Sequence, residues 1–107
     1  MSKEYIIIMV MCASRKEAAK ISDKLLKQRL VACANTISGI GSKFWWKGKI
    51  DSAKETLVIL KTTRSNFKKV ETEIRQLHSY EIPEIIAIPI IAGSFNYLTW
   101  IRDSVHA

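Results

Sequence analysis

Two runs of consecutive apolar residues restrict the fold of this chain more than any other feature. The first lies in a strand expected over residues 4–12, and a strand turns alternate side chains to opposite faces. One face carries Ile6, Ile8, Val10 and Cys12, and the other carries Tyr5, Ile7, Met9 and Met11. The second run, Leu57–Leu60, is likewise apolar on both faces. A sheet that contains both strands needs cover on both of its faces.

The length of the chain limits it to one domain. Its 107 residues suffice for one sizeable core and are too few for two. The composition, with 48% hydrophobic and 25% charged residues, is typical of a globular protein, and no apolar stretch approaches the roughly 20 residues that span a bilayer. We therefore expect a single domain over residues 1–107 without a membrane span.

The start of the chain lacks signal-peptide features, so we expect a cytoplasmic protein. In that compartment we expect two free thiols, Cys12 and Cys33.

Capping residues and apolar spacing predict three helices. Ser14 and Glu17 form a capping box, in which each side chain satisfies a backbone N–H at the start of a helix that ends near Leu30. Ser65 is expected to cap a second helix, whose apolar positions are Phe67, Val70, Ile74 and Leu77. Ser94 is expected to cap a short third helix, whose apolar positions are Leu98, Ile101 and Val105.

Further strands complete the pattern. A long strand over residues 31–46, bent near Gly39, is followed by a hairpin turn and the strand Ile50–Thr63. Pro89 suits an end or a bulge of the last strand, Ile85–Ile91. The order is β-α-β-β-α-β plus a C-terminal helix. This is the ferredoxin-like split βαβ arrangement, an α+β fold with an antiparallel sheet.

The second face of this sheet predicts self-association. Two helices cover only one face, and the other face is usually polar. Here it carries Met9, Ile59 and Ile86, and one short terminal helix is too small to cover it. We therefore expect sheet-to-sheet oligomerisation, with the long hairpin reaching over a neighbouring subunit.

The charge of the chain is a weak indication of its partner. The 17 Lys and Arg exceed the 10 Asp and Glu, which gives a net charge of +7, but the basic residues are dispersed, as on a solvated surface. Residues 43–49 interleave Lys with aromatic side chains as single-strand binders do, yet the central strands lack the aromatic residues of RNA-recognition modules. We expect no nucleic-acid partner, and interpret Trp45, Trp46 and Trp100 as residues of subunit contacts.

A polar turn over residues 78–84 holds the densest set of reactive groups. A thiolate with an imidazole suits copper or zinc, so Cys33 and His78 are the expected soft metal ligands, with Glu81 and Glu84 as hard ones. None of these residues has the spacing of a metal motif, so such a site would join distant segments or different subunits. Two alternatives stay open. Cys33 is also typical of a small buried hydrophobic residue, and His78 of a residue at a helix C-terminus.

An enzyme is the least favoured interpretation. Cys33, His78 and Glu81 match a cysteine-nucleophile scheme in residue type only, because a mid-strand cysteine without an oxyanion donor is poorly exposed for attack. No glycine-rich phosphate loop is present in the sequence. We therefore predict a metal-binding or interaction protein without catalytic activity.

Four stretches, in this order, together resemble the CutA family of divalent-cation tolerance proteins: Leu30–Asn35, Ser42–Ile50, His78–Ile86 and Tyr97–Ile101. The likeness covers nearly the whole chain. It implies a very stable homotrimer of ferredoxin-like subunits, similar in architecture to PII signalling proteins, with clefts between subunits. It also implies tolerance to copper and other divalent metals, copper binding in some members, and a link of animal relatives to acetylcholinesterase anchoring.

The resemblance carries over to individual positions, which are Cys33, Trp46, Lys61, His78, Tyr80, Glu81, Pro83, Glu84 and Trp100. It implies an intersubunit cleft lined by Trp46, Lys61, Tyr80, Glu81 and Glu84, and trimer contacts through Trp45 and Trp100. Copper or another divalent metal is the expected ligand, without being a required cofactor. The alternative is a trimeric interaction or small-ligand-sensing protein of PII type, in which metal binding is incidental and the protein partner is unknown.

The chain departs from the family pattern at one position of the polar turn. The family usually has proline between the histidine and the tyrosine, where this sequence has Ser79. Serine has a backbone N–H that proline lacks and a less restricted φ. The orientation of His78 is therefore the feature of the family that this departure affects most.

Overall fold

The computed structural model describes residues 4–106. Along the chain the elements are β1 (Tyr5–Cys12), α1 (Arg15–Lys27), β2 (Cys33–Trp46), β3 (Lys49–Thr63), the 3₁₀ turn η2 (Arg64–Asn66), α2 (Phe67–Leu77), β4 (Ile85–Pro89) and α3 (Phe95–Ser104). The strands form one antiparallel sheet in the order β2-β3-β1-β4. The predicted ferredoxin-like α+β fold with a C-terminal helix is confirmed.

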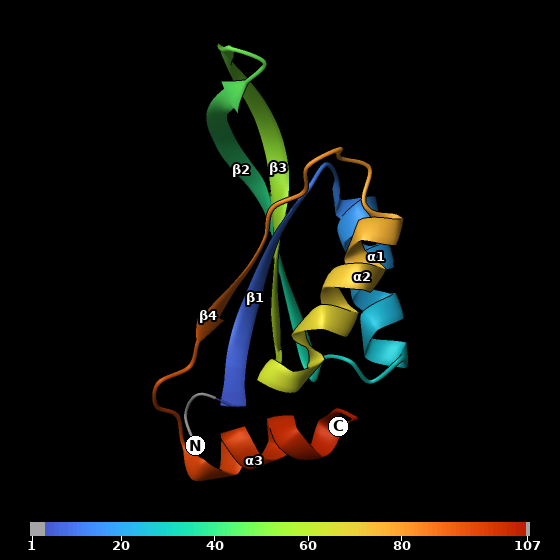
Figure 1. Ribbon diagram of the computed structural model, residues 1–107, viewed down its shortest axis with the longest axis vertical. Helices are drawn as coiled ribbons and strands as arrows, with labels where there is room; N and C mark the ends of the chain where they lie inside the picture. Colours follow the sequence, from blue (N-terminus) through green and yellow to red (C-terminus); the bar gives the residue numbers. More distant parts are fainter. Residues whose placement is uncertain (1–3, 107) are drawn as a thin grey trace.

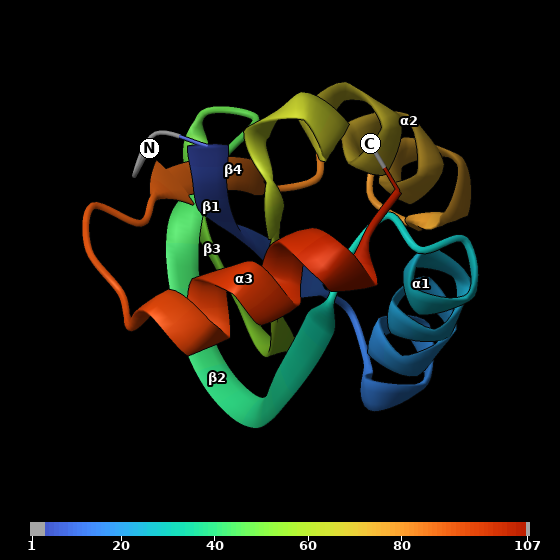
Figure 2. The same ribbon diagram turned by 90° about the horizontal axis from the view of Figure 1, so that it is seen from below.

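The helices are distributed unequally around the sheet. Helices α1 and α2 lie side by side on one face, and α3 crosses one end of the sheet (Figures 1 and 2). The β2–β3 hairpin extends past the helices at the opposite end, which makes the molecule elongated, 44 × 26 × 23 Å (Figure 1).

The core lies between the sheet and helices α1 and α2. The predicted inward face of β1 is confirmed, since Ile8, Val10 and Cys12 are fully buried there. Ile21 and Leu25 of α1 and the predicted apolar positions of α2 pack against it. This face of the sheet is therefore a closed, apolar layer.

The long hairpin has the bend and the turn that its glycines predict. The pairing of β2 with β3 shifts between Ile37 and Ile40, where Gly39 has a φ of +76°. At the tip, Lys47 and Gly48 have φ values of 50° and 79°. Positive φ at both central residues is the conformation of a two-residue type I′ hairpin turn.

Some predicted boundaries are wrong. Helix α1 ends at Lys27 rather than near Leu30, β2 begins at Cys33 rather than at residue 31, and β4 ends at Pro89 rather than at Ile91. Arg29, with a φ of 55°, ends the first helix early. Proline cannot donate a ladder hydrogen bond, which agrees with its position at the end of β4.

The predicted cap of α2 is also wrong. Ser65 lies inside η2, and its hydroxyl hydrogen-bonds the Thr63 hydroxyl (3.2 Å) rather than a helical N–H. Asn66 is the residue before the helix, but its side-chain amide donates to the carbonyls of Leu30 (3.3 Å) and His106 (3.0 Å). Asn66 therefore connects three segments of the chain instead of capping α2.

The other face of the sheet, here called the open face, has little cover within the described protomer. It carries Cys33, Asn35 and Ile37 of β2, Leu57, Ile59 and Lys61 of β3, Ile7, Met9 and Met11 of β1, and Ile86 and Ile88 of β4. Helix α3 lies only at its lower end, and Ile86 keeps 48% of its surface exposed. The prediction that both faces of the sheet are apolar is confirmed.

Candidate metal centre

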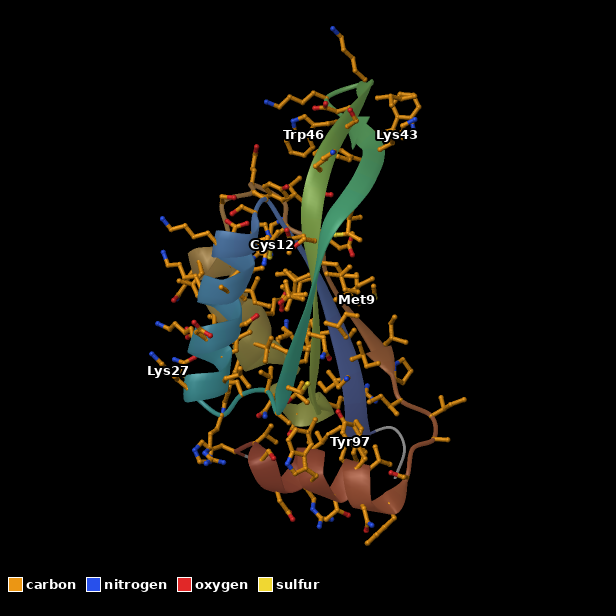
Figure 3. All side chains as sticks on the ribbon, turned by 180° about the vertical axis from the view of Figure 1, so that it is seen from behind. Met9, Cys12, Lys27, Lys43, Trp46 and Tyr97 are labelled. Atoms are coloured by element: carbon orange, nitrogen blue, oxygen red, sulfur yellow. The ribbon has the colours of Figure 1, made fainter. Side chains whose placement is uncertain are left out.

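Three potential metal ligands meet where β1 ends. One ligand atom each from Cys12, Glu17 and His78 lies within 4.8 Å of the others. Cys12 is the last residue of β1, beside the start of α1 (Figure 3), Glu17 lies in the first turn of α1, and His78 directly follows α2. The cluster therefore joins three segments that are far apart in the sequence.

The topology explains why His78 reaches Cys12. Strand β4 is the antiparallel neighbour of β1, with Ile85 opposite Val10. The turn from α2 into β4, residues 78–84, therefore has to pass the end of β1. Cys12 and His78 meet because the fold requires this crossing.

Glu17 binds both sides of the junction. Its own N–H donates to the Ser14 hydroxyl (3.1 Å), as the capping box predicts, while its carboxylate accepts the N–H of Ala13 (2.8 Å) and of Ser79 (2.8 Å). Burial alone would raise the pKa of Glu17, but these hydrogen bonds and the nearby His78 lower it below its ordinary value. Glu17 is therefore a carboxylate at neutral pH, and it binds the N–H that proline would lack.

The His78 imidazole is fully buried and both of its nitrogens are bound. Nε2 lies 2.6 Å from the Met11 carbonyl oxygen, and Nδ1 accepts the Tyr80 N–H at 3.1 Å. A carbonyl oxygen only accepts, so Nε2 carries the proton and the ring is in its neutral Nε2–H form. Nδ1 also lies 3.8 Å from a Glu17 carboxylate oxygen.

Cys12 supplies a protonated thiol. Burial first, and then the charges of Glu17 and Glu55, raise its pKa to about 12. The thiol is neutral at physiological pH, and it is inert towards reagents that need a thiolate. A metal ion that binds Cys12 has to displace this proton.

A buried carboxylate–phenol pair lies beside the cluster. The Tyr80 hydroxyl donates to the Glu55 carboxylate at 2.7 Å, and Glu55 is only 7% exposed. Burial and this hydrogen bond raise the pKa of Tyr80 above its usual value. The Tyr80 ring also contacts the His78 ring, with 4.7 Å between centroids. The pair therefore connects the 78–84 turn to β3.

Cys33, the predicted partner of His78, lies on the other side of the sheet. Its side chain is on the open face, where Sγ donates to the Asn35 amide oxygen (3.5 Å), and the same oxygen accepts from Lys61 Nζ (2.9 Å). Because His78 lies on the helical side, the sheet separates the two residues within one protomer. A site that uses both therefore requires two protomers.

The other predicted site residues are spread along the molecule. Trp45 is 74% exposed near the hairpin tip, and Trp46 is half-buried, with Lys47 Nζ 5.8 Å from its ring centroid. Trp100 on α3 is partly exposed and packs against Tyr97, and the carboxylates Glu81 and Glu84 are exposed on the turn. Within the described part of the chain, the predicted cleft and metal positions form two separate pairs: His78 with Tyr80 on the turn, and Cys33 opposite Lys61 on the open face.

Cys12, Glu17 and Glu55 were missed as site residues from the sequence. Cys12 resembles a core residue because it continues the inward face of β1, and Glu17 is explained by its capping position alone. The signal that finds them is topological. A split βαβ fold places the α2–β4 turn over the end of β1, so polar residues at both places belong to one cluster.

The fold and this cluster together define a small α+β protein with a candidate metal centre. The family model of the CutA1 divalent ion tolerance protein matches residues 6–104. The divalent-cation tolerance protein CutA of Archaeoglobus fulgidus is 43% identical over 98 residues, 92% of this chain and 95% of that protein. The solved CutA1 structure from Thermus thermophilus matches with a TM-score of 0.93 at 33% identity, over 95% of this chain and 99% of that one. The chain therefore belongs to the CutA1 family of divalent-cation tolerance proteins, as the resemblance predicted.

Some relatives are longer than this chain. It is 35% identical over 99 residues to the chloroplastic CutA of Arabidopsis thaliana, which is 92% of this chain but 54% of the plant protein. The chain thus spans about half the length of that relative. The A. thaliana relative is named as a chloroplastic protein, and the A. fulgidus structure as that of a periplasmic one. In residues 4–106, no helix combines the length and the hydropathy that crossing a bilayer requires.

Proposed function

We propose that this protein binds a divalent metal ion through Cys12, Glu17 and His78, and that this binding underlies its role in divalent-cation tolerance. The observation that carries the proposal is the convergence of sulfur, oxygen and nitrogen ligand atoms within 4.8 Å. A thiolate, an imidazole and a carboxylate suit zinc and copper. With three protein ligands, a fourth position stays open for water or for exchange of the ion.

The proposal is tested by zinc titration calorimetry on the reduced protein. We expect about one ion per chain, and a loss of affinity of at least about tenfold in Cys12→Ser, which replaces the sulfur ligand. Cys33→Ser is the matched control, because it removes the other thiol from the opposite face. A loss of affinity in Cys33→Ser and not in Cys12→Ser would contradict the proposal.

The predicted Cys33–His78 metal site stays a prediction. Copper is the metal that the predicted thiol–imidazole pair favours, and the pair would form between protomers. Copper titration of a Cys12→Ser protein tests this site, because Cys33 is then the only thiol. Binding that disappears in Cys12→Ser/Cys33→Ser, but not in Cys12→Ser alone, would support the intersubunit site.

We also propose that the functional assembly is a homotrimer associated through the open face. What supports this is the apolar character of that face, together with the exposed aromatic residues Trp45 and Trp100. Within one protomer, Lys61 lies towards the opposite end of β1 from Tyr80, Glu81 and Glu84. A cleft lined by all of these residues and Trp46 therefore needs more than one subunit. Light scattering should give the mass of a trimer with and without zinc, and a monomer in both conditions would contradict it.

A second candidate function, small-ligand sensing, is favoured by the polar groups around Lys61. Lys61 Nζ has Asn35 as its hydrogen-bond acceptor and lies 5.9 Å from the Tyr97 ring, and no described carboxylate pairs with it. If the open face is covered in the assembly, this cation requires an anionic partner. Citrate and inorganic phosphate are suitable probes. A rise in melting temperature with either probe that disappears in Lys61→Met would support this function, and no rise would contradict it.

The remaining proposals concern compartment and partners. We propose a cytoplasmic protein, which is supported by two free thiols on opposite faces of the sheet. The family name describes tolerance to metal ions rather than a reaction, and we propose no catalytic residue. The partners we propose are the metal ion and further copies of the chain, without nucleic acid. Fractionation of the cells that make the protein tests the compartment.

A further inference from the structure

The hydrogen bonds of His78 create a conflict with metal binding. In the structure, Nε2–H donates to the Met11 carbonyl and Nδ1 accepts the Tyr80 N–H. A neutral imidazole that binds a metal ion uses one nitrogen as the ligand and carries its proton on the other. The two possible choices of ligand nitrogen have the same consequence for Tyr80.

If Nδ1 binds the metal, it can no longer accept the Tyr80 N–H. If Nε2 binds the metal, the proton moves to Nδ1. The Nδ1–H then faces the Tyr80 N–H, and two donors cannot form a hydrogen bond. In both cases the 3.1 Å hydrogen bond between His78 and Tyr80 is lost. The part-buried Tyr80 N–H then lacks an acceptor, and a movement of the backbone at Tyr80 towards solvent gives it one.

The second candidate ligand is connected to the same turn. One Glu17 carboxylate oxygen accepts the Ser79 N–H at 2.8 Å, and a metal ion at that oxygen competes with this hydrogen bond. Two of the three ligands in the cluster therefore hold consecutive residues of the 78–84 turn. The Tyr80 hydroxyl donates to Glu55 of β3, so a movement of the Tyr80 backbone also works against this hydrogen bond.

We propose that metal binding at this cluster breaks the hydrogen bonds that Glu17 and His78 make to the N–H groups of residues 79 and 80, so that residues 79–84 become mobile while His78 stays bound and the segment reports whether the site is occupied. The inference rests on the proposed metal site and adds its regulation. The released segment carries Glu81 and Glu84 and leads directly into β4, the edge strand next to β1. Metal occupancy thereby changes the position of exposed carboxylates without a change in the core of the sheet.

Metal binding and the loss of the turn's hydrogen bonds affect each other equally, so the coupling between them can also be measured as a change in metal affinity. If metal binding breaks the hydrogen bonds of the turn, then a variant that lacks one of them has less to break and binds metal more tightly. Tyr80→Phe removes the hydroxyl that binds Glu55 and keeps the ring. A net hydrogen bond corresponds to about a fivefold change in an equilibrium constant, which is the expected gain in zinc affinity. Tyr97→Phe is the matched control, since the Tyr97 hydroxyl has no hydrogen bond in residues 4–106.

The experiment combines zinc titration with amide hydrogen exchange on the reduced full chain. We expect saturating zinc to accelerate exchange at residues 79–84 at least about tenfold while the fully buried centre of β1 is unchanged. Tyr80→Phe should bind zinc about fivefold more tightly than the wild type and Tyr97→Phe.

The outcomes separate the two proposals. One outcome is zinc binding that depends on Cys12, with no faster exchange in the turn and with equal affinity in Tyr80→Phe. This outcome overturns the release of the turn and leaves the metal site in place. No zinc binding, or binding that is unaffected in Cys12→Ser, overturns the metal site and with it this inference. Melting temperatures of all variants confirm that they are folded.

Discussion

The two faces of the sheet treat similar chemical groups in opposite ways. On the helical face, Cys12 is fully buried and the nearby polar groups of Glu17, His78 and Tyr80 are hydrogen-bonded to one another, to backbone or to Glu55. On the open face, Cys33 and Lys61 share one amide oxygen and are surrounded by exposed apolar residues. The first face is complete within one chain, and the second is complete only when something covers it. The same sheet thus separates a site built by the fold from a surface built for association.

The largest expected effect distinguishes the two faces by their apolar packing. Ile8 is fully buried on the helical face, and Ile8→Ala should lower the free energy of unfolding by about 3–4 kcal/mol, because it removes buried methyl groups and leaves a cavity. Ile86 on the open face is half-exposed, and Ile86→Ala should cost the protomer below about 1 kcal/mol. Denaturant unfolding measures both values. A loss at Ile86 as large as that at Ile8 would mean that the open face is covered and packed in solution, as the proposed trimer requires.

The two cysteines provide the next contrast. The pKa of about 12 and full burial make Cys12 unreactive, whereas Cys33 is only half-buried. With iodoacetamide at pH 8, the Cys12→Ser protein should be modified at least about 100-fold faster than the Cys33→Ser protein when the protomers are separated, and more slowly in the proposed trimer. Mass spectrometry after timed quenching gives the two rates. A slow rate at both positions would show that Cys33 is covered by a neighbouring subunit.

The acid range tests the junction around Glu17. Its pKa is lower in the folded protein than the ordinary 4.5, so the carboxylate stabilises the fold above that value. This stabilisation is lost as the pH falls through the lower, folded pKa. At pH 7, Glu17→Gln should therefore unfold more easily than the wild type by about 1 kcal/mol, with the difference shrinking towards pH 3.

Glu81→Gln is the control for this prediction. Its carboxylate lies on the same turn and is exposed, without a hydrogen bond or ion pair in the described part of the chain. Unfolding curves at pH 3, 5 and 7 should show no difference between this variant and the wild type. A difference between Glu17→Gln and the wild type that stays constant from pH 7 to pH 3 would contradict the assigned role of Glu17.

The sequence predicts the fold well because the fold depends on periodic features. The alternation in β1, the capping box at Ser14 and the hairpin glycines each specify local structure, and their order leaves one common topology. The metal cluster depends instead on three residues at unrelated positions, two of which have adequate structural explanations. The sequence favours Cys33 over Cys12 as a ligand because alternation places Cys12 on a core face, and spacing does not show what lies opposite either cysteine.

The smallest expected effect comes from Ser79, where two opposing contributions nearly cancel. Proline at this position removes the N–H that Glu17 accepts, which destabilises the fold by about 1–2 kcal/mol. Proline also restricts the unfolded chain, which stabilises the fold by about 0.4–1 kcal/mol. His78, with φ −80° and ψ 140°, already has the backbone conformation that a residue before proline adopts. The net loss in Ser79→Pro should therefore lie between about 0 and 1.6 kcal/mol.

The acid dependence separates these two contributions better than the stability itself. Because Ser79 N–H is one of the groups that lower the pKa of Glu17, Ser79→Pro should weaken the loss of stability between pH 5 and pH 3. Ser79→Ala keeps the N–H but removes the hydroxyl, which also lowers the pKa of Glu17, so its pH profile should lie between those of Ser79→Pro and the wild type. If Ser79→Pro and Ser79→Ala have the same pH profile, the Glu17–Ser79 hydrogen bond contributes nothing, and the 78–84 turn is held by His78 and Tyr80 alone.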